Sequence, residues 1–482
     1  MKFSSPVFSL GLLASSVGAI QVNFDSDESI KAAASTVAFG LARFYTGNNT
    51  GDTPGNLPDP YFWWEAGAMF GTLVDYWFHT GDDSYNAMTT QALLHQVGDD
   101  RDYMPTNQTR TLGNDDQGFW AMAAMSAAEN NFPNPPPDQP QWLALAQAVF
   151  NEYVDRWDEE HCDGGLRWQI FQFNAGFEYK NTISNGCFFN IASRLARYTG
   201  NQTYADWAGK VWTWLEGHEL IDSEYNVFDG AGIVDECATH DKAQWTYNAG
   251  IYLHGAAALY DYTNGSAKAT WQTRIEGLIS RTREHFFDKD TGILVERACE
   301  TFGNCNNDQQ SFRGYLMRWF GAAMQLAPFT YDTLMPILRT NAAAAARQCT
   351  GSPPASQYRG PPGTACGFTW TGSFDGLVGV GPQMSALSAL QYTLIKKADT
   401  AVPATALTGG TSVGDVNAGA RDEEKLVTFD PITMGERVAA GFATSAIALS
   451  LIAAVVFMMR DETEIEVRME KLEGEKVVKW GV

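Results

Sequence analysis

The chain has 482 residues, of which 45% are hydrophobic and 13% aromatic, so it can bury a large core and is not an intrinsically disordered chain. Its 33 basic and 56 acidic residues give a formal net charge of −23. Such a charge repels the phosphate backbone of nucleic acids, and we therefore expect no nucleic-acid partner.

Residues 1–19 have the features of a signal peptide. Lys2 precedes a short apolar stretch, and Val17 and Ala19 are small residues at the spacing that signal peptidase accepts. The alternative is a buried N-terminal helix. Asn-x-Ser/Thr sequons also fit a secretory route, and they occur at Asn48, Asn107, Asn201 and Asn264.

Residues 22–395 form the predicted folded body. Apolar residues recur there at helical spacing in twelve segments that begin near residues 27, 60, 83, 115, 139, 185, 203, 242, 267, 308, 330 and 375. The motifs FYTGNNT, FHTGDDSY, RYTGNQTY and DYTNGSA separate some of these segments. Their glycines suit left-handed helix caps, so the sequence predicts tight helix hairpins at Gly47, Gly81, Gly200 and Asn264-Gly265.

A second kind of turn is predicted to form longer, β-prone loops. An Asp or Asn before Gly and an apolar pair occurs in HCDGGLRW, FDGAGIVDE, DKDTGILVE and SFDGLVGV. Short turns on one face and long loops on the other are typical of stacked helix pairs. Six such pairs predict an all-α fold, the (α/α)6 barrel of six inner and six outer helices, with an open solenoid as the alternative.

The seven cysteines are candidates for disulfides in an oxidising compartment. Cys299 and Cys305 enclose a short loop, and Cys349 and Cys366 flank a Pro/Gly-rich one, so these are the preferred pairs. One residue among Cys162, Cys187 and Cys237 stays unpaired, and the sequence does not indicate which. No histidine or cysteine cluster has the spacing of a metal site, and we expect neither metal nor cofactor.

Asp115 and Asp116 precede an apolar run in the stretch GNDDQGFWAMAAMSAAEN. Neighbouring side chains on a helix point about 100° apart, and two buried carboxylates without partners are costly. We therefore place the pair at a helix start, where capping and the helix dipole are one explanation. The other is catalysis, because a retaining glycosidase uses two carboxyl groups about 5–5.5 Å apart.

Aromatic and polar residues near other helix starts are candidates for sugar binding. The aromatic candidates for stacking on sugar rings are Trp63, Trp64, Trp120, Trp168 and Trp245. The candidates for binding mannose hydroxyls are Asn185, Asp241, Tyr247 and Asn248, and Arg313 is a candidate for orienting a carboxylate or a charged substrate group. Core packing and helix capping explain the same residues equally well.

Four segments together resemble glycoside hydrolase family 76, the family of endo-α-1,6-mannanases. They are NDDQGFWAMAAMSAAE at 114–129, SNGCFFNIASRLARYTGN at 184–201, WTYNAGIYLHGAAALY at 245–260 and QQSFRGYLMRWF at 309–320. The resemblance covers residues 25–395 and implies an (α/α)6 barrel, no metal and a retaining mechanism. It also implies that Asp115 is the nucleophile and Asp116 the general acid/base.

The fungal branch of this family is implicated in linking mannoproteins to the cell wall. The resemblance therefore implies a donor in α-1,6-mannan or the mannose core of a glycolipid anchor, and transglycosylation when a sugar hydroxyl replaces water, with wall glucan as a candidate acceptor. Two rivals remain, a non-catalytic mannan-binding cell-wall protein and an inverting (α/α)6 glycosidase, whose carboxyl groups stand roughly 6.5–9.5 Å apart.

The C-terminal residues divide into three predicted segments. Residues 396–437 lack aromatic periodicity and are predicted to be a linker. Residues 438–459 are uncharged and long enough to cross a bilayer, and residues 460–482 form a charged tail. The alternative, a glycolipid-anchor signal with attachment at residues 417–419, does not explain this tail. We expect membrane attachment, with the folded body at the extracellular face of the plasma membrane or in the cell wall.

Overall fold

The computed structural model describes residues 19–397, 402–419 and 433–478. The predicted signal peptide therefore lies, except for its last residue, outside the described residues. The chain divides into two compact units, Met1–Ala420 and Arg421–Val482, and each is described by itself.

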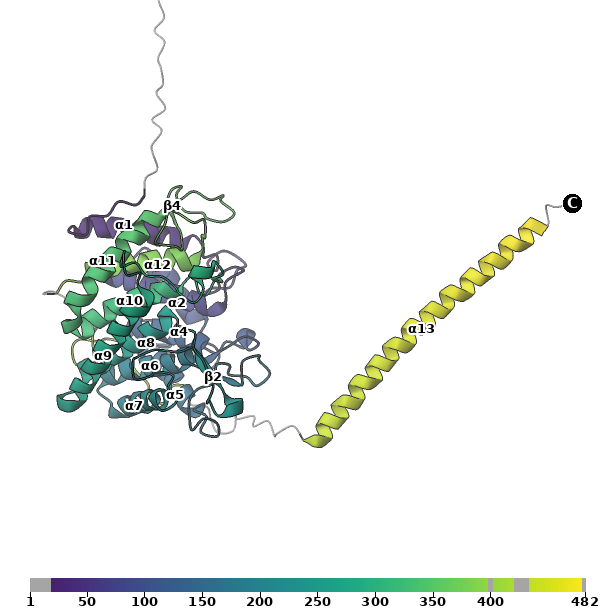
Figure 1. The fold of residues 1–482 in the computed structure, drawn as a ribbon, viewed down its shortest axis with the longest axis horizontal. Helices are drawn as coiled ribbons and strands as arrows, with labels where there is room; N and C mark the ends of the chain where they lie inside the picture. The colour runs from purple at the N-terminus through teal and green to yellow at the C-terminus, as the bar shows by residue number, and fades with distance from the viewer. Residues whose placement is uncertain (1–18, 398–401, 420–432, 479–482) are drawn as a thin grey trace, which may run out of the picture. The chain divides into compact units, whose positions relative to one another are not determined.

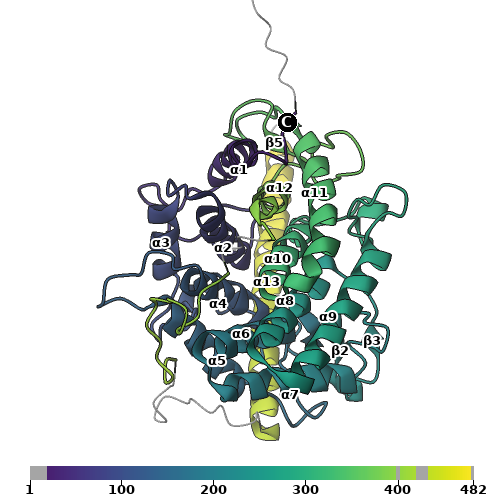
Figure 2. The same cartoon turned by 90° about the vertical axis from the view of Figure 1, so that its left-hand side faces the viewer.

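The first unit is a closed double ring of helices (Figures 1 and 2). The even-numbered helices α2 to α12 each pack against the next, and α12 packs against α2, so the inner ring closes. The odd-numbered helices α1 to α11 lie outside it. Among the described residues of this unit the twelve helices are α1 (Asp27–Ala42), α2 (Trp63–Thr80), α3 (Asn86–His95), α4 (Asn114–Glu129), α5 (Trp142–Asp155), α6 (Thr182–Thr199), α7 (Gln202–Gly217), α8 (Thr246–Tyr262), α9 (Gly265–Phe286), α10 (Phe312–Leu326), α11 (Tyr331–Gln348) and α12 (Val380–Gln391). This confirms the predicted (α/α)6 barrel and excludes the open solenoid.

The remaining regular elements are short and lie in the connections. Strands β1 (Tyr179–Asn181), β2 (Gly230–Gly232) and β3 (His240–Asp241) form an antiparallel sheet, and β4 (Cys349–Gly351) pairs with β5 (Ala365–Cys366). The 3-10 helices are η1 (Thr106–Gln108), η2 (Ile233–Asp235), η3 (Glu300–Phe302), η4 (Pro328–Thr330) and η5 (Tyr392–Leu394). The first sheet lies in the loops that lead into α6 and α8, as the β-prone turns predict.

The predicted glycine caps are present at two of the four positions, where Gly81 and Gly200 end α2 and α6 with φ of 78° and 74°. Gly265 has φ of 57° but is the first residue of α9, and α8 ends at an extended Thr263, so the cap predicted at Asn264-Gly265 is absent. The prediction for Gly47 was wrong, because α1 already ends at Ala42. A Cβ at Gly47 would be 2.7 Å from the Tyr45 ring, so glycine there permits close packing within a long loop.

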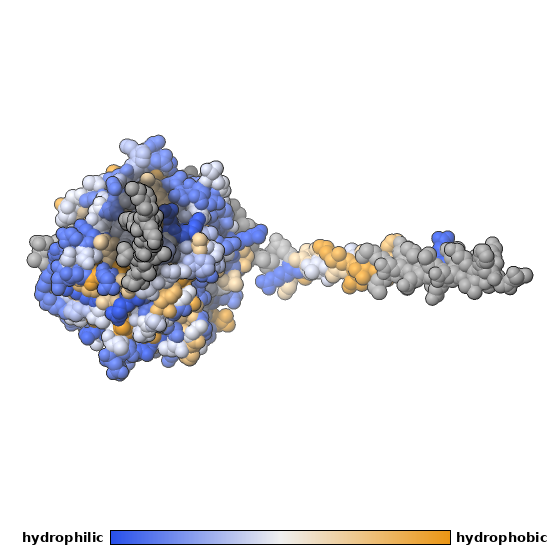
Figure 3. Space-filling view, turned by 90° about the horizontal axis from the view of Figure 1, so that it is seen from above, coloured by the Kyte–Doolittle hydropathy of each residue, from blue (hydrophilic) through white to orange (hydrophobic). Residues whose placement is uncertain are grey.

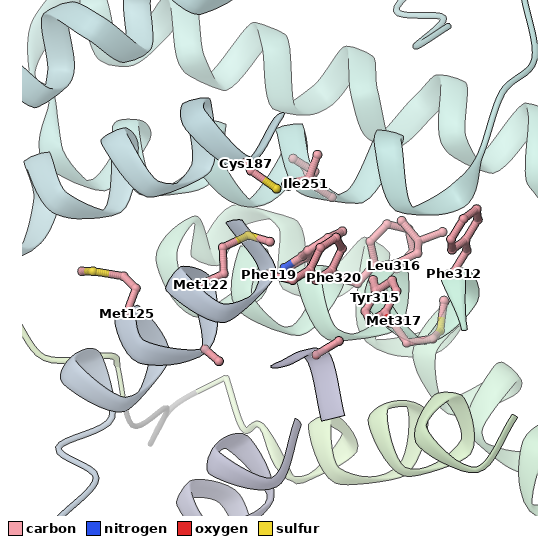
Figure 4. Packing of buried hydrophobic residues seen from close by; sticks show 14 of the residues in the cluster. Phe119, Met122, Met125, Cys187, Ile251, Phe312, Tyr315, Leu316, Met317 and Phe320 are labelled. Carbon is pink, nitrogen blue, oxygen red and sulfur yellow. The ribbon is translucent and has the colours of Figure 1, made fainter. Parts of the chain in front are cut away.

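Bulky side chains and small residues alternate where the inner helices meet. Phe119 of α4 and Tyr315 of α10 meet inside the barrel with ring centroids 5.2 Å apart (Figure 4). A Cβ at Gly67 of α2 would be 2.8 Å from Trp120 of α4, so the missing side chain lets the indole ring pack against the backbone. Close packing of this kind fixes where each inner helix begins and hence where its first turn points.

The disulfides follow the sequence prediction and resolve the open choice. Cys299 bonds to Cys305 and Cys349 to Cys366. Cys162 bonds to Cys237 across 75 residues, which ties the loop after α5 to the loop before α8. The unpaired cysteine is Cys187, buried in α6.

The predicted linker at 396–437 differs from the structure over residues 402–419, which we call the strap. The backbone N–H of Ala404 donates to the carbonyl of Glu129 at 2.6 Å, and Arg197 donates to the carbonyl of Pro403 at 2.7 Å. Near its other end, Asn151 donates to the carbonyl of Ala418 at 2.8 Å. The strap is therefore part of the first unit, while residues 398–401 and 420–432 lie outside the described residues.

The second unit contains α13 (Met434–Val478). Residues Arg437–Phe457 form a candidate membrane span of 21 residues by length and composition, and its most apolar 18 residues have a mean hydropathy of 2.2 and are not buried. This stretch is coloured as hydrophobic in Figure 3 and matches the predicted segment 438–459. The helix continues through residues 460–478, which belong to the predicted charged tail.

Candidate active site

The N-terminal ends of the inner helices surround a cavity of about 350 Å³, within the range of roughly 300–1,000 Å³ typical of ligand sites. Four aspartates and a set of aromatic rings face it. The lining consists of Phe62, Trp63, Trp64, Gln108, Thr111, Leu112, Asp115, Asp116, Phe119, Trp168, Gln169, Tyr179, Asn181, Asp229, Trp245, Tyr247, Asn306, Asp308, Gln309 and Phe312.

The start of α4 is fixed by hydrogen bonds to the neighbouring loop. The backbone N–H of Asn114 donates to the carbonyl of Trp168 at 2.8 Å, and its side-chain amide donates to the carbonyl of Arg167, also at 2.8 Å. The Tyr153 hydroxyl donates to the carbonyl of Asn114. Asp115 and Asp116 therefore project from a rigid first turn, at the end of the helix dipole that favours negative charge.

The two aspartates have different hydrogen-bond partners. Asp115 accepts from the Asn181 side chain at 3.1 Å on Oδ2 and from the backbone N–H of Asp116 at 3.0 Å on Oδ1. Asp116 accepts from the backbone N–H of Gly113 at 2.6 Å. Both residues line the same cavity, so one ligand in that cavity can contact both carboxyl groups.

The pKa values of both carboxyl groups are raised, and to different extents. Burial raises the pKa of Asp115 to about 7, while its hydrogen bonds from Asn181 and the backbone act in the opposite direction. Burial and the neighbouring charge of Asp115 raise the pKa of Asp116 well above its usual range. Asp115 is thus the first of the pair to ionise, and Asp116 retains its proton, which is the division between a nucleophile and a general acid.

Five of the sequence-predicted binding residues line the cavity: Trp63, Trp64, Trp168, Trp245 and Tyr247. Trp168 is 38% exposed and presents an open aromatic face. Tyr247 and Phe312 stack with ring centroids 3.8 Å apart and an interplanar angle of 6°. Aromatic faces next to carboxyl groups suit a sugar ring, which has apolar C–H faces and polar edges.

The other five predicted residues lie outside the lining: Trp120, Asn185, Asp241, Asn248 and Arg313. Trp120 is fully buried beneath Trp63, with ring centroids 5.1 Å apart. Asn185 is also buried and accepts from the backbone N–H of Leu166 at 2.8 Å. These two residues support the cavity from behind it.

The remaining three residues have local partners or are enclosed. Arg313 is buried, pairs with Glu300 and lies 3.9 Å from the centre of the Phe368 ring. Asp241 is exposed at the end of strand β3 and accepts from the backbone N–H of Ala243 at 2.9 Å, and Asn248 is fully buried in α8. We leave all five out of the substrate contacts proposed below.

The polar lining residues that sequence reasoning missed include Asn181, Asp229 and Asp308. Burial raises the pKa of Asp308 to about 6, and the Trp64 indole donates a hydrogen bond to its carboxyl group. Asp229 accepts from the Tyr179 hydroxyl at 2.8 Å. Two signals were available, since Asp308 lies shortly before the start of inner helix α10, and Asp229 belongs to the FDGAG turn.

A family model described as glycosyl hydrolase family 76 matches residues 29–406, which is most of the chain and nearly all of the barrel. The chain belongs to glycosyl hydrolase family 76. The expectation of a glycosidase of this family is therefore confirmed. The match includes the first residues of the strap, in agreement with their place in the first unit.

Two similar proteins are both named mannan endo-1,6-alpha-mannosidase. The chain is 46% identical over 445 residues to mannan endo-1,6-alpha-mannosidase DCW1 of Saccharomyces cerevisiae, covering 92% of this chain and 95% of the relative. It is 42% identical to mannan endo-1,6-alpha-mannosidase DFG5 of the same organism, covering 92% and 94%.

Among solved family 76 structures, Dfg5 from Chaetomium thermophilum in complex with glucosamine is 46% identical, with a TM-score of 0.78 and coverage of 84% of this chain and 99% of that one. An inactive α-1,6-mannanase variant from Salegentibacter in complex with α-1,6-mannotriose is 19% identical, with a TM-score of 0.59 and coverage of 76% and 99%. The second likeness concerns the fold alone.

Proposed function

We propose that this family 76 enzyme cleaves α-1,6-linked mannose with retention of the anomeric configuration. The main support is the adjacent pair Asp115 and Asp116 in an aromatic-lined cavity, with pKa values that separate their roles. The substrate class is supported by the names of relatives more than 40% identical over most of the chain.

The short distance between the two carboxyl groups supports retention. Asp115 Oδ1 lies 2.4 Å and Asp116 Oδ2 lies 3.1 Å from the place that a Cβ on Gly113 would occupy, so these two oxygens are at most about 5.5 Å apart. An inverting enzyme leaves roughly 6.5–9.5 Å between its carboxyl groups, because a water molecule must fit there.

In the proposed reaction, Asp115 attacks the anomeric carbon as the bond to the leaving oxygen breaks, and Asp116 gives its proton to that oxygen. The product of this step is a mannosyl ester on Asp115. Asp116, now ionised, removes a proton from an incoming hydroxyl group, whose oxygen attacks the anomeric carbon and releases Asp115. The Asn181 amide stabilises the Asp115 carboxylate before attack and after release.

The incoming hydroxyl group defines a second part of the proposal. If it belongs to water, the reaction is hydrolysis; if it belongs to a sugar, the reaction is transglycosylation. We propose the mannose core of a glycolipid anchor as the donor and wall glucan as the acceptor. Support comes from the family resemblance and from the glucosamine bound to the Chaetomium thermophilum relative, since a glycolipid-anchor core joins mannose to an amino sugar.

We also propose that the enzyme acts on the extracellular side of the plasma membrane or in the cell wall. The candidate span Arg437–Phe457 would attach it to the membrane. Three disulfides and four exposed sequon asparagines fit passage through an oxidising secretory compartment.

Single substitutions test the catalytic pair in the detergent-solubilised full chain. Asp115→Asn and Asp116→Asn should each lower kcat on α-1,6-mannooligosaccharides by about 10⁴-fold, while the circular dichroism spectrum stays unchanged. Asp290→Asn is the matched control, because this aspartate is exposed and outside the cavity lining. Wild-type turnover by both site variants would refute the assignment, and a wild-type protein that binds mannan without turnover would be a mannan-binding protein.

A further inference from the structure

A second cavity, of about 620 Å³, lies in the loops that precede α6 and α8, next to the catalytic cavity. We call it the extension cavity. Residues Gln172, Asn174, Gly176, Phe177, Glu178 and Tyr179 form much of its lining. These residues belong to the loop that ends in strand β1, which also provides Asn181 at its far end.

The two cavities have a lining residue in common. Tyr179 belongs to the lining of both of them, and its hydroxyl group donates to Asp229 of the catalytic cavity at 2.8 Å. Gly176 lies against the Trp168 ring so closely that a Cβ would collide with it, and its φ is 99°. A chain molecule that leaves the catalytic cavity across Trp168 and Tyr179 therefore passes directly into the extension cavity.

The size of the catalytic cavity makes such an exit necessary for a long ligand. Its volume of about 350 Å³ is near the lower end of the usual range for small-molecule sites, which is roughly 300–1,000 Å³. An enzyme that cleaves within a polysaccharide must hold sugars on both sides of the scissile bond. Part of a long glycan must then lie outside the catalytic cavity.

The cations around the extension cavity already have partners. Arg167 pairs with Asp158 at 2.7 Å and donates to the carbonyl of Phe177 at 3.1 Å. Lys180 is fully buried, pairs with Asp158 at 3.3 Å and donates to three backbone carbonyls. A phosphate or carboxylate ligand would have to compete with these bonds and would meet the exposed carboxylate of Glu178.

The accessible groups of the extension cavity instead suit a neutral polyhydroxylated molecule. Gln172 and Glu178 are exposed and supply amide and carboxylate groups for hydroxyl groups. Phe177 and Tyr179 add aromatic rings. Polar groups that bond hydroxyls, together with aromatic faces and without a free counter-charge, are the chemistry of a carbohydrate site.

We propose that the extension cavity binds those sugars of a neutral oligosaccharide that continue past the catalytic cavity. The inference rests on the proposed function, since it assumes that a glycan occupies the catalytic cavity. Its consequence is a preference for long substrates that comes from loop residues 172–178, apart from the catalytic pair.

Binding to an inactive enzyme tests the proposal without turnover. In the detergent-solubilised Asp115→Asn chain, calorimetry with α-1,6-mannohexaose and α-1,6-mannobiose should show tighter binding of the hexaose. Adding Gln172→Ala and Glu178→Ala, or Ala175→Trp to fill the cavity, should weaken hexaose binding by about ten-fold, as expected for the loss of one or two hydrogen bonds. Binding of the biose should stay unchanged.

Glu160→Ala is the matched control, because Glu160 is an exposed acid on the same side of the fold and outside both cavity linings. On the otherwise wild-type enzyme, the same loop substitutions should lower kcat/KM for the hexaose and leave that for the biose unaltered. Equal losses for both substrates, or no loss for either, would overturn the proposal. A wild-type enzyme that cleaves neither substrate would instead contradict the proposed function.

Discussion

Asp115 and Asp116 are neighbours in sequence, yet their surroundings give them different acid strengths. Asp115 accepts two hydrogen bonds that favour its ionised form, from Asn181 and from the backbone. Asp116 faces the charge of Asp115 and accepts a single backbone N–H. The difference arises from the first turn of α4 and from β1, which brings Asn181 to the cavity.

The pH dependence of activity follows from these surroundings. Asp115 must be ionised to attack, so kcat/KM should fall as the pH drops below its pKa of about 7. Asn181→Ala removes a donor to the ionised carboxylate and should shift this acid limb to higher pH by about half a unit to one unit. A kcat/KM profile over pH with an α-1,6-mannoside measures the shift. An acid limb that stays in place or moves to lower pH would contradict the role of Asn181.

The sequence pointed to Asp115 and Asp116 more readily than to their neighbours. Helix α1 also begins with two adjacent acids, Asp27 and Glu28, so the signal was the NDDQGFWAMAAMSAAE motif around the pair, whereas a single buried Asn or Arg has many structural uses. Asn185 and Arg313 bind loop backbone and an acid outside the cavity, which no local pattern reveals. Asp308 was missed because its place in the cavity depends on how α10 packs in the ring.

At the scale of the helices, local signals located the elements and tertiary contacts closed the ring. The predicted starts near 115 and 203 correspond to Asn114 and Gln202, while the start near 375 corresponds to Val380. Caps and apolar spacing define each helix separately. The packing of α12 against α2 joins the first and last inner helices, and no short stretch of sequence contains that information.

A buried ion pair joins two inner helices. Arg194 of α6 lies 2.6 Å from Glu129 of α4, and both side chains are almost fully buried. Glu129→Ala leaves the guanidinium without its counter-charge and should lower the free energy of unfolding by about 3–5 kcal/mol. Urea denaturation followed by circular dichroism measures the change.

The double substitution Glu129→Leu with Arg194→Met is the control for this pair. It removes both charges and should recover most of the lost stability, because burial of an unpaired charge is the main cost. If the double variant were as unstable as the sum of the two single variants, the ion pair would not be the source of the effect.

At the scale of the whole molecule, the sequence predicted that the folded body ends at residue 395, whereas the described part of the first unit extends through the strap to residue 419. Its composition is that of a linker, rich in Ala, Thr and Gly. It is held mainly through its backbone, by side chains of the barrel such as Asn131, Asn151 and Arg197. Sequence periodicity detects apolar faces, and it therefore failed to detect a segment bound in this way.

Two truncations test the place of the strap. A chain that ends at residue 419 should remain soluble without detergent and keep wild-type kcat/KM, because it retains the whole described first unit. A chain that ends at residue 397 leaves the buried guanidinium of Arg197 without its strap carbonyls, at a cost of about 1–3 kcal/mol for each unsatisfied buried group. Its melting temperature should be several degrees lower. Equal melting temperatures of the two chains would show that the strap does not stabilise the barrel.

The central claim is that Asp115 forms a covalent bond to mannose during turnover, and trapping this species tests it most directly. The full chain is incubated with an activated fluoro-mannoside that slows release, digested, and mapped by mass spectrometry. We expect one mannosyl adduct on the peptide that contains Asp115, and an α-configured first product by NMR. A β-configured first product without any adduct, or an adduct on another carboxyl group, would contradict the account.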